Sequence, residues 1–430
     1  MAIRQDLEEL LDKGVIEREV FDKLQAYYSG KRKEKPNLML LVFGVIGAIL
    51  VGAGLILLIA HNWDDYPNSI KLLCAYGPLI LGKLVAAYSI RNKPESEIWK
   101  ESSAVFLYFA IGACIALVAQ IYNISGDAGT FFLTWNLLSL PLVFILSSSV
   151  NSLLVIAGLT NYAMVAGFLD GNYKIPYGYS LLVILIIPYY LRLRQEHKDS
   201  VLLGLHNWFL AISALCVLPT LMEVKSSFLI IDYFVLFGLF AIVGTLFFAD
   251  HRYSWFNSFL IIAELGGICL LFILSFDGYW NDSTRTNWHP DQFVNSFESA
   301  VSIVFLLVAG FLLWAYRNVF NWRQSGRYIL FFAPLLIYCL KLSSDQSMIL
   351  INLILLSFGI WTIRVGASQK KLKVLNLGLS VISLLIFLRF FDADISFVWR
   401  GIIFLLLGCG FFAANYFMNK KLKQDENVSK

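Results

Sequence analysis

One carboxylate sits deep inside an apolar stretch of the sequence, and its position is the clearest pointer to chemistry. Glu264 is enclosed by Ile261-Ile-Ala on one side and Leu265-Gly-Gly on the other. An ionised group in the hydrocarbon of a membrane is costly, and such residues usually face a cavity, a partner or a transported ion. The sequence therefore predicts an intramembrane proton or cation site at Glu264. A protonated or paired structural acid is the alternative.

A second group of polar residues follows the ends of two early apolar stretches. We predict that its members form a polar cluster on the outer face: His61, Asn62, Trp63, Asp64, Asp65 and Asp127. Two adjacent acids in a first outer loop resemble those of membrane glycosyltransferases acting on lipid-linked sugars, but this loop is short. The alternative is that the tryptophan anchors the membrane interface while the acids close a turn or cap a helix.

Familiar catalytic patterns are absent from the sequence. No GxxxxGK[ST], GxGxxG, HExxH or GxSxG string occurs in a suitable context, which disfavours ATP hydrolysis, dinucleotide binding and the common hydrolases. The six cysteines all lie in apolar stretches and none is within four residues of another, so they form neither a metal motif nor a redox pair. We therefore predict no catalytic residue, no metal and no cofactor.

The elements that must position these residues are membrane-spanning helices. The chain is 58% hydrophobic and 15% charged, whereas soluble domains carry roughly 25% charged residues. Its apolar residues come in blocks of about twenty, the length that crosses a bilayer. We predict an all-α polytopic bundle of about fourteen spans, at residues 38–60, 70–90, 103–121, 130–147, 150–169, 176–192, 201–222, 227–249, 255–276, 299–316, 327–341, 347–367, 372–388 and 397–418.

The placement of positive charge predicts the orientation. One set of alternate loops carries fourteen Lys or Arg residues and the opposite set carries six. Basic loops stay in the cytoplasm, so both termini are expected there. Nucleic-acid binding is disfavoured, because topology explains the basic residues. The outer loops carry twelve acids, which indicates either a cation-attracting mouth or simply the retention of bases inside.

Small residues and a charged tail complete the predicted architecture. Gly44, Ala48 and Gly52 lie four apart on the first span, where they would let two helices pack closely. Residues 1–36 have helical apolar periodicity interrupted at Gly14, which predicts a cytoplasmic amphipathic hairpin. This hairpin is too small for a core of its own, so it should dock on the membrane, on the chain or on a protein partner. Residues 37–418 then form the bundle and 419–430 a charged tail.

Several strings in the first third resemble a known family. They are Gly44-Val-Ile-Gly-Ala-Ile-Leu-Val-Gly-Ala-Gly54, then Leu57-Leu-Ile-Ala-His-Asn-Trp-Asp64, and Ala119-Gln-Ile-Tyr-Asn-Ile-Ser-Gly-Asp127. Together with the turn at Gly14-Val-Ile16, they resemble the bacterial predicted-membrane-protein family known as domain of unknown function 2157, over about residues 5–150. The resemblance implies a multi-pass protein of the bacterial cytoplasmic membrane and assigns no activity.

Three function classes stay open at this point. A transporter or flippase-like carrier is favoured by the number of spans, by Glu264 and by the acidic outer face. A non-catalytic sensor, scaffold or assembly factor is favoured by the docking hairpin and by the lack of a convergent site. A membrane-embedded enzyme acting on a lipid-linked substrate is the least favoured. Charged groups converging with Glu264 on a water-filled cavity would support transport, and a sealed apolar core would support the scaffold.

Overall fold

The protein is helical throughout the part that its structure, a computed structural model, describes. The described residues are 11, 13–33, 63–169, 175–196, 198, 200–221, 229–248, 254–281, 297–318, 328–340 and 342–392, with scattered residues between 402 and 416. Two compact units divide the chain, residues 1–74 and residues 75–430.

The first unit contains a tight turn followed by a helix. Gly14 has a φ of +65°, and its N–H donates to the carbonyl of Leu11 at 3.0 Å. Glycine adopts this left-handed conformation without strain, which suits the end of a helix. α2 (Arg18–Lys33) comes next. Both features agree with the predicted hairpin. Most of its first helix and its end at residue 36 lie outside the described residues, so the domain boundary stays a prediction.

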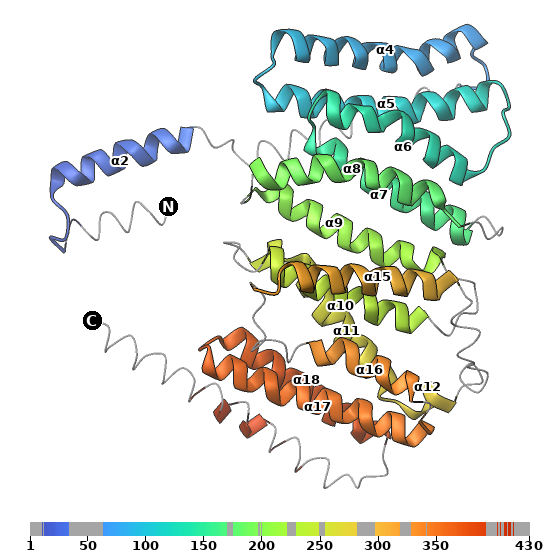
Figure 1. The fold of residues 1–430 in the computed structure, drawn as a ribbon. Coiled ribbons are helices and arrows are strands. Elements are labelled where there is room, and N and C mark those ends of the chain that lie inside the picture. Colours follow the sequence, from blue (N-terminus) through green and yellow to red (C-terminus); the bar gives the residue numbers. More distant parts are fainter. Residues whose placement is uncertain are drawn as a thin grey trace. The chain divides into compact units, whose positions relative to one another are not determined.

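Six long helices continue from the end of the first unit into the second (Figure 1). They are α4 (Asn68–Asn92), α5 (Glu97–Ile121), α6 (Ala128–Ile145), α7 (Ser149–Met164), α8 (Tyr177–Glu196) and α9 (Val201–Val217). α7 runs on into a π-turn at Val165–Leu169, and α9 into a 3-10 turn at Leu218–Leu221. The starts of α6, α7 and α9 follow from their capping residues, because Asp127, Ser148 and Ser200 each accept a backbone N–H of the first turn.

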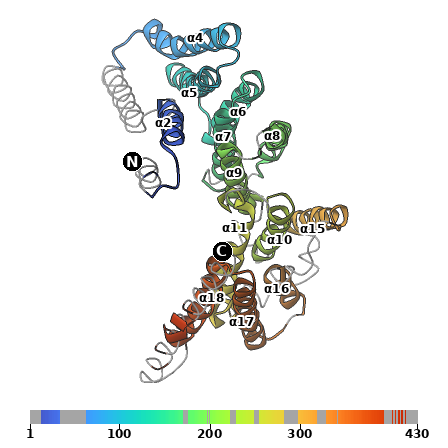
Figure 2. The same ribbon diagram turned by 90° about the vertical axis from the view of Figure 1, so that its left-hand side faces the viewer.

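The rest of the second unit is built around α10. Its helices are α10 (Leu229–Phe247), α11 (Ser258–Leu274), α12 (Asp277–Asn281), α15 (Phe297–Ala315), α16 (Ile329–Cys339), α17 (Ser344–Ser368) and α18 (Leu372–Asp392). α10 contacts α11, α15 and α16, and α17 lies against α18, as Figures 1 and 2 both show. The core here is apolar, and Phe234, Leu271 and Phe331 are almost inaccessible within it.

These helices confirm the predicted membrane class. Twelve of the fourteen predicted spans coincide with helices, while 38–60 lies outside the described residues and 397–418 is described only in part. Within the described part, eight helices are long and apolar enough to cross a membrane. α16 has only 11 residues, so at 1.5 Å per residue it covers roughly half of a bilayer core.

The surface of these helices is apolar as well. Leu73, Leu84, Leu307 and Phe311 are each more than 60% exposed. Large apolar side chains exposed in such numbers would aggregate in water, but they are the normal outer surface of a helix in lipid. A hydrophobic solvent around the helices therefore explains both the composition and the exposure pattern.

One predicted surface loop is partly buried. Residues 277–298 lie between the predicted spans 255–276 and 299–316, where an exposed loop is the simple expectation, and Trp280 belongs to this connection. The structure places Trp280 on α12 at 2% exposure, and its indole N–H donates to the carbonyl of Leu274 at 2.7 Å. An aromatic ring with one polar group can be buried in this way once that group has found an acceptor. Residues 282–296 of the loop lie outside the described part.

Candidate functional site

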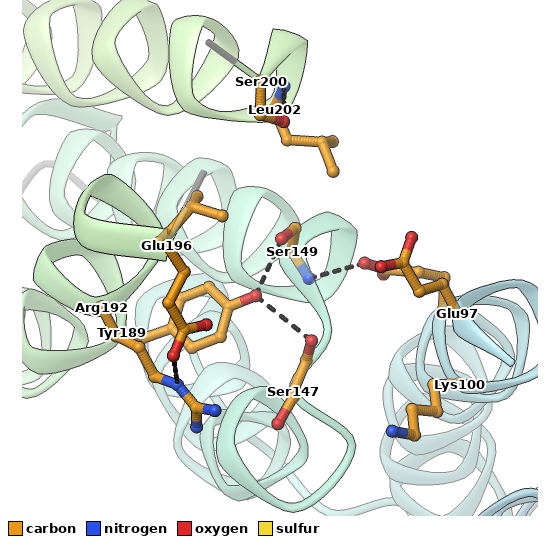
Figure 3. Close-up of a pocket in the computed structure, with 11 residues that line it drawn as sticks. Glu97, Lys100, Ser147, Ser149, Tyr189, Arg192, Glu196, Ser200 and Leu202 are labelled. Atoms are coloured by element: carbon orange, nitrogen blue, oxygen red, sulfur yellow. Dashed lines mark hydrogen bonds and ion pairs between the residues drawn. The ribbon is translucent and has the colours of Figure 1, made fainter. Parts of the chain in front are cut away.

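A polar pocket of about 250 Å³ lies among the starts of α5, α7 and α9 and the end of α8 (Figure 3). α5 and α8 supply facing walls, the turn between α6 and α7 supplies the floor, and the start of α9 closes one side. Its lining comprises Glu97, Lys100, Glu101, Ser147, Ser149, Tyr189, Arg192, Leu193, Glu196, Ser200 and Leu202. The three connections that meet here are ones predicted to lie on the same, basic side of the membrane.

The floor is held by a carboxylate from a neighbouring helix. Glu101 on α5 accepts hydrogen bonds from the backbone N–H of Ser149 (2.8 Å) and of Val150 (3.0 Å), and from the Ser148 hydroxyl. These donors form the first turn of α7, whose N–H groups would otherwise lack partners and whose dipole favours a negative charge. The interaction therefore fixes the start of α7 against α5.

A tyrosine joins the floor to α8. The Tyr189 hydroxyl lies 2.8 Å from the Ser149 hydroxyl and donates to the carbonyl of Ser147 at 3.3 Å. Ser147 has a φ of +50°, which makes the corner between α6 and α7 sharp enough to present that carbonyl. Figure 3 shows the tyrosine reaching across from α8 to both serines. The floor is thus polar, and its hydroxyl and carbonyl groups are hydrogen-bonded to one another.

The two walls carry charges of both signs. On α8, the Arg192 Nε donates to Glu196 at 2.8 Å, and both side chains are at least half exposed. On α5, Lys100 and Glu97 have no ion pair with any described residue. A cation and an anion are therefore available on one wall, and the outer nitrogens of a guanidinium are available on the other.

A second, apolar pocket of about 440 Å³ lies at the other end of α8 and α9, against α15. Val217, Val301 and Phe305 contribute to its lining, and Tyr179 brings a polar group to its edge. The Tyr179 hydroxyl lies 2.7 Å from the Ser213 hydroxyl, which lies 2.6 Å from that of Thr160. A short chain of hydroxyl groups therefore runs from this pocket into the contact between α7 and α9.

An apolar plug separates the two pockets. Leu182 and Ile186 of α8 pack against Val155, Ile156 and Leu159 of α7, and all five are buried. The plug lies between Tyr179, at the apolar pocket, and Tyr189, at the polar one. Tyr189 lies ten positions after Tyr179 in α8, which is about 15 Å of helix.

A buried histidine lies near Tyr189 of the polar pocket. His206 on α9 is fully inaccessible, and its ring centre is 6.3 Å from that of Tyr189. Its Nδ1 is 2.7 Å from the carbonyl of Leu202, so Nδ1 must carry a proton, because a carbonyl only accepts. In the neutral ring Nε2 is then an acceptor, and it has no hydrogen bond within the described residues.

Sequence reasoning overlooked a second carboxylate inside a span. Asp232 lies one turn into α10, is fully buried and accepts a hydrogen bond from the Ser302 hydroxyl of α15. The signal was present, since an acid within Leu229-Ile-Ile-Asp-Tyr-Phe is as unexpected in an apolar helix as Glu264 is. Asp232 lies only five positions after the predicted start of its span at residue 227, where a charged side chain is less unusual than at the centre.

Glu264 lies apart from the two pockets. It is half-buried on α11, between buried Ala263 and exposed Leu265, and it lines neither pocket. The ion or proton site predicted there stays a prediction.

The outer-face cluster is only partly described. In the first unit, Asp64 and Asp65 are exposed in a turn, and the Lys71 ammonium lies 5.8 Å from the ring centre of Trp63. In the second unit, Asp127 caps α6 by accepting from the Thr130 N–H at 2.5 Å. These contacts fit the turn-closing and capping alternative. His61, Asn62, Gly44, Ala48 and Gly52 all lie outside the described residues.

The arrangement offers binding chemistry, with charges, hydroxyls and a shaped cavity. Within the described residues, no group of three or more His, Cys, Asp or Glu side chains could hold a metal ion.

Comparison with known proteins adds a family and no activity. No curated protein and no solved structure matches the chain. Residues 8–151 match the model of the family described as predicted membrane protein, DUF2157. This match confirms the resemblance predicted over about residues 5–150, and over that third of its length the chain is similar to the predicted membrane proteins of this family.

Proposed function

We propose that the protein is a membrane carrier for a small polar or amphipathic solute, with its pathway between α7, α8 and α9. The observation that carries this proposal is the pair of pockets at opposite ends of the same helices. Between them about 15 Å of α8 remains, roughly half the thickness of a bilayer core. A carrier needs such a thin barrier, because only a short segment must rearrange to pass a solute across.

α8 is the element that we expect to move. Pro188 interrupts its hydrogen-bond ladder next to the plug. Large apolar side chains such as Leu181, Ile184 and Ile187 are exposed along it, toward lipid. Movement of α8 away from α7 would part the plug while leaving the floor of the polar pocket, which α5 and α7 hold, in place.

The wider setting belongs to the same proposal. The basic loops support a bacterial cytoplasmic membrane with both termini in the cytoplasm. The partly buried Glu264 is a proton or cation site that could be coupled to movement. The N-terminal hairpin, which includes α2, is proposed to dock on a protein partner or on the lipid surface.

Accessibility of single cysteines tests the pathway without knowledge of the solute. In a chain whose native cysteines are replaced, Ser149→Cys, His206→Cys and Ser213→Cys are introduced one at a time. Each is treated with a small, charged, membrane-impermeant thiol reagent in whole cells and in inverted vesicles. His206 is buried on α9 between the residues of this helix that line the two pockets, Leu202 and Ala214. A carrier predicts that His206→Cys reacts slowly from both sides, while Ser149→Cys and Ser213→Cys each react mainly from one side.

The matched control is Ala241→Cys, which is fully buried in the apolar core around α10. It should stay unlabelled from either side. Protection of His206→Cys that equals the protection of Ala241→Cys would contradict a pathway through these helices.

A scaffold or assembly factor is the second candidate, and one observation favours it. The core around α10 is apolar and tightly packed, and Gly266 and Gly267 allow Phe237 and Leu330 to approach the α11 backbone closely. A rigid core of this kind suits a platform for other proteins. Such a platform predicts no slow labelling of His206→Cys.

A further inference from the structure

We propose that the polar pocket binds a zwitterion with a phosphate group at one end and a primary ammonium at the other, the chemistry of phosphoethanolamine. This inference rests on the proposed function, because it gives a chemical class to the solute that enters at this pocket. Some charged groups of the pocket are already bonded to other groups of the protein, and the remaining ones are available to a ligand.

The negative end of a ligand has two cations to meet. Lys100 stands on α5 and Arg192 on α8, so they face the cavity from opposite walls (Figure 3). Among the described residues, Arg192 forms a hydrogen bond only through its Nε, which leaves the outer guanidinium nitrogens for a ligand. Two cations approaching from different directions suit a tetrahedral phosphate, whereas a planar carboxylate is best held by one guanidinium in a bidentate pair.

The positive end of a ligand has one acid to meet. Glu101 is taken up by the first turn of α7, and Glu196 by Arg192. Glu97 has no such partner among the described residues, and it lies one turn from Lys100 on α5. A primary ammonium can donate hydrogen bonds to a carboxylate. A quaternary ammonium is usually held by several aromatic rings, and among the described residues that line this pocket Tyr189 is the only aromatic one.

The size of the pocket agrees with a small ligand. Its volume of about 250 Å³ lies just below the range of roughly 300–1,000 Å³ that is usual for drug-sized molecules. Hydroxyls of Ser147, Ser149 and Tyr189 at the floor would contact the linker between the two charges. The same chemistry is present in a free phosphoethanolamine ester and in a lipid headgroup, and the pocket lies at the helix ends, where headgroups are found.

Calorimetric titration of the full chain in an uncharged maltoside detergent tests the proposal. The probes are glycerophosphoethanolamine, glycerophosphocholine, inorganic phosphate and ethanolamine. Glycerophosphoethanolamine should bind more tightly than each of the others. Lys100→Met should lower the affinity for glycerophosphoethanolamine and for phosphate about five-fold, the effect of losing one exposed ion pair, and should leave the affinity for ethanolamine unchanged. Glu97→Gln should lower the affinity for glycerophosphoethanolamine and for ethanolamine to a similar degree, and should leave the affinity for phosphate unchanged.

Two neighbouring charges serve as matched controls. Lys93→Met and Glu95→Gln remove exposed charges just before α5 that do not line the pocket, so they should leave all affinities unchanged. Loss of binding in these controls too would show a general effect of surface charge and would overturn the proposal, as would equal affinities for all four probes.

The source of the zwitterion is decided by native mass spectrometry after extraction from nanodiscs of phosphatidylethanolamine and phosphatidylcholine. Retained phosphatidylethanolamine that Lys100→Met loses identifies a lipid headgroup. Binding of the soluble ester without retained lipid identifies a free solute, and either result supports the proposal. If no probe binds while His206→Cys is labelled from both sides, the proposal of a zwitterionic ligand is wrong and the proposal of a carrier still holds. If the ester binds while His206→Cys stays protected, the pocket is a binding site and the solute does not pass through these helices.

Discussion

At the scale of single residues, Glu101 has the largest structural role that the described contacts reveal. It joins two helices by accepting from three donors at the start of α7. Hydrogen bonds to charged groups contribute roughly 1.5–3 kcal/mol each, and removing an acceptor leaves buried donors unsatisfied. Glu101→Ala should therefore lower the free energy of unfolding by about 2–4 kcal/mol, measured by thermal unfolding in detergent.

The conservative variant and a control make that prediction specific. Glu101→Gln keeps one acceptor oxygen for these donors and should lose less than half as much stability as the alanine variant. Glu95→Ala removes an exposed acid just before α5 and should change stability by less than about 0.5 kcal/mol. Equal losses for Glu101→Gln and Glu101→Ala would mean that the charge, and not the acceptor oxygens, holds α7.

Asp232 is the residue that sequence reasoning should have weighed beside Glu264. Its carboxylate links α10 to Ser302 of α15 inside the apolar core. Asp232→Asn preserves the acceptor oxygen for Ser302 and should cost less than about 1 kcal/mol, whereas Asp232→Ala removes that acceptor and should cost about 1–3 kcal/mol. Thermal unfolding of both variants decides this. Asp232→Asn as damaging as Asp232→Ala would point instead to a requirement for the ionised form.

At the scale of elements, close approaches of helices show where packing leaves no room. A Cβ added to Gly158 of α7 would lie 2.2 Å from Asn136 Oδ1 of α6 and 2.6 Å from the Tyr108 hydroxyl of α5. Both neighbours are buried and hydrogen-bonded to each other at 3.3 Å. Gly158→Ala should thus destabilise the protein by about 1–3 kcal/mol. Gly310→Ala, on α15 where nothing lies within 4 Å, should stabilise it by about 0.5–1 kcal/mol. Thermal unfolding of the pair measures both, and equal shifts would contradict the packing of α6 against α7.

We expect α8 to move when the pathway opens, and its proline allows a test. Pro188→Ala restores a backbone N–H one turn after Ile184, which should stiffen the helix beside the plug. If α8 moves to open the pathway, Pro188→Ala should slow the labelling of His206→Cys several-fold while leaving Ser149→Cys labelling unchanged. The rates of thiol modification in inverted vesicles measure both. Unaltered labelling of His206→Cys would place the moving element elsewhere.

The helices could be predicted from the sequence because apolar runs are a simple signal. The polar pocket could not be predicted in this way. A run of about twenty apolar residues predicts a helix regardless of its neighbours. Even the short break between α6 and α7 was predicted to within about two residues, from the polar residues Ser148 to Asn151 between two apolar blocks. The polar pocket is assembled from residues up to about a hundred positions apart, between Glu97 and Leu202. Neither Glu101 nor Tyr189 differs in the sequence from any other residue near a helix end, so only their contacts in the fold reveal them.

At the scale of the whole second unit, the described contacts divide the connections between helices into two groups, one at each end of the helices. The polar pocket gathers those after α4, α6 and α8. At the other end of the helices, Ser344 at the start of α17 donates to the carbonyl of Trp280 in α12, and Arg389 near the end of α18 donates to Ser275. This sorting matches the alternation predicted from basic residues. The contacts define which connections share an end, and the charges predict which end is cytoplasmic.

Labelling of single cysteines tests which end of the helices faces the cytoplasm. In the chain without native cysteines, Lys93→Cys, Lys198→Cys and Lys371→Cys represent one end, and Ser125→Cys, Tyr177→Cys and Asp345→Cys the other; the side chains of all six are exposed. Because basic loops are retained in the cytoplasm, an impermeant thiol reagent should label the first three only in inverted vesicles and the second three only in whole cells. Lys371→Cys and Asp345→Cys test the second half most severely, since the short helix α16 must return the chain across the membrane between α15 and α17. Reversed labelling of this pair, with Lys371→Cys reacting only in whole cells and Asp345→Cys only in inverted vesicles, would show that α16 does not cross.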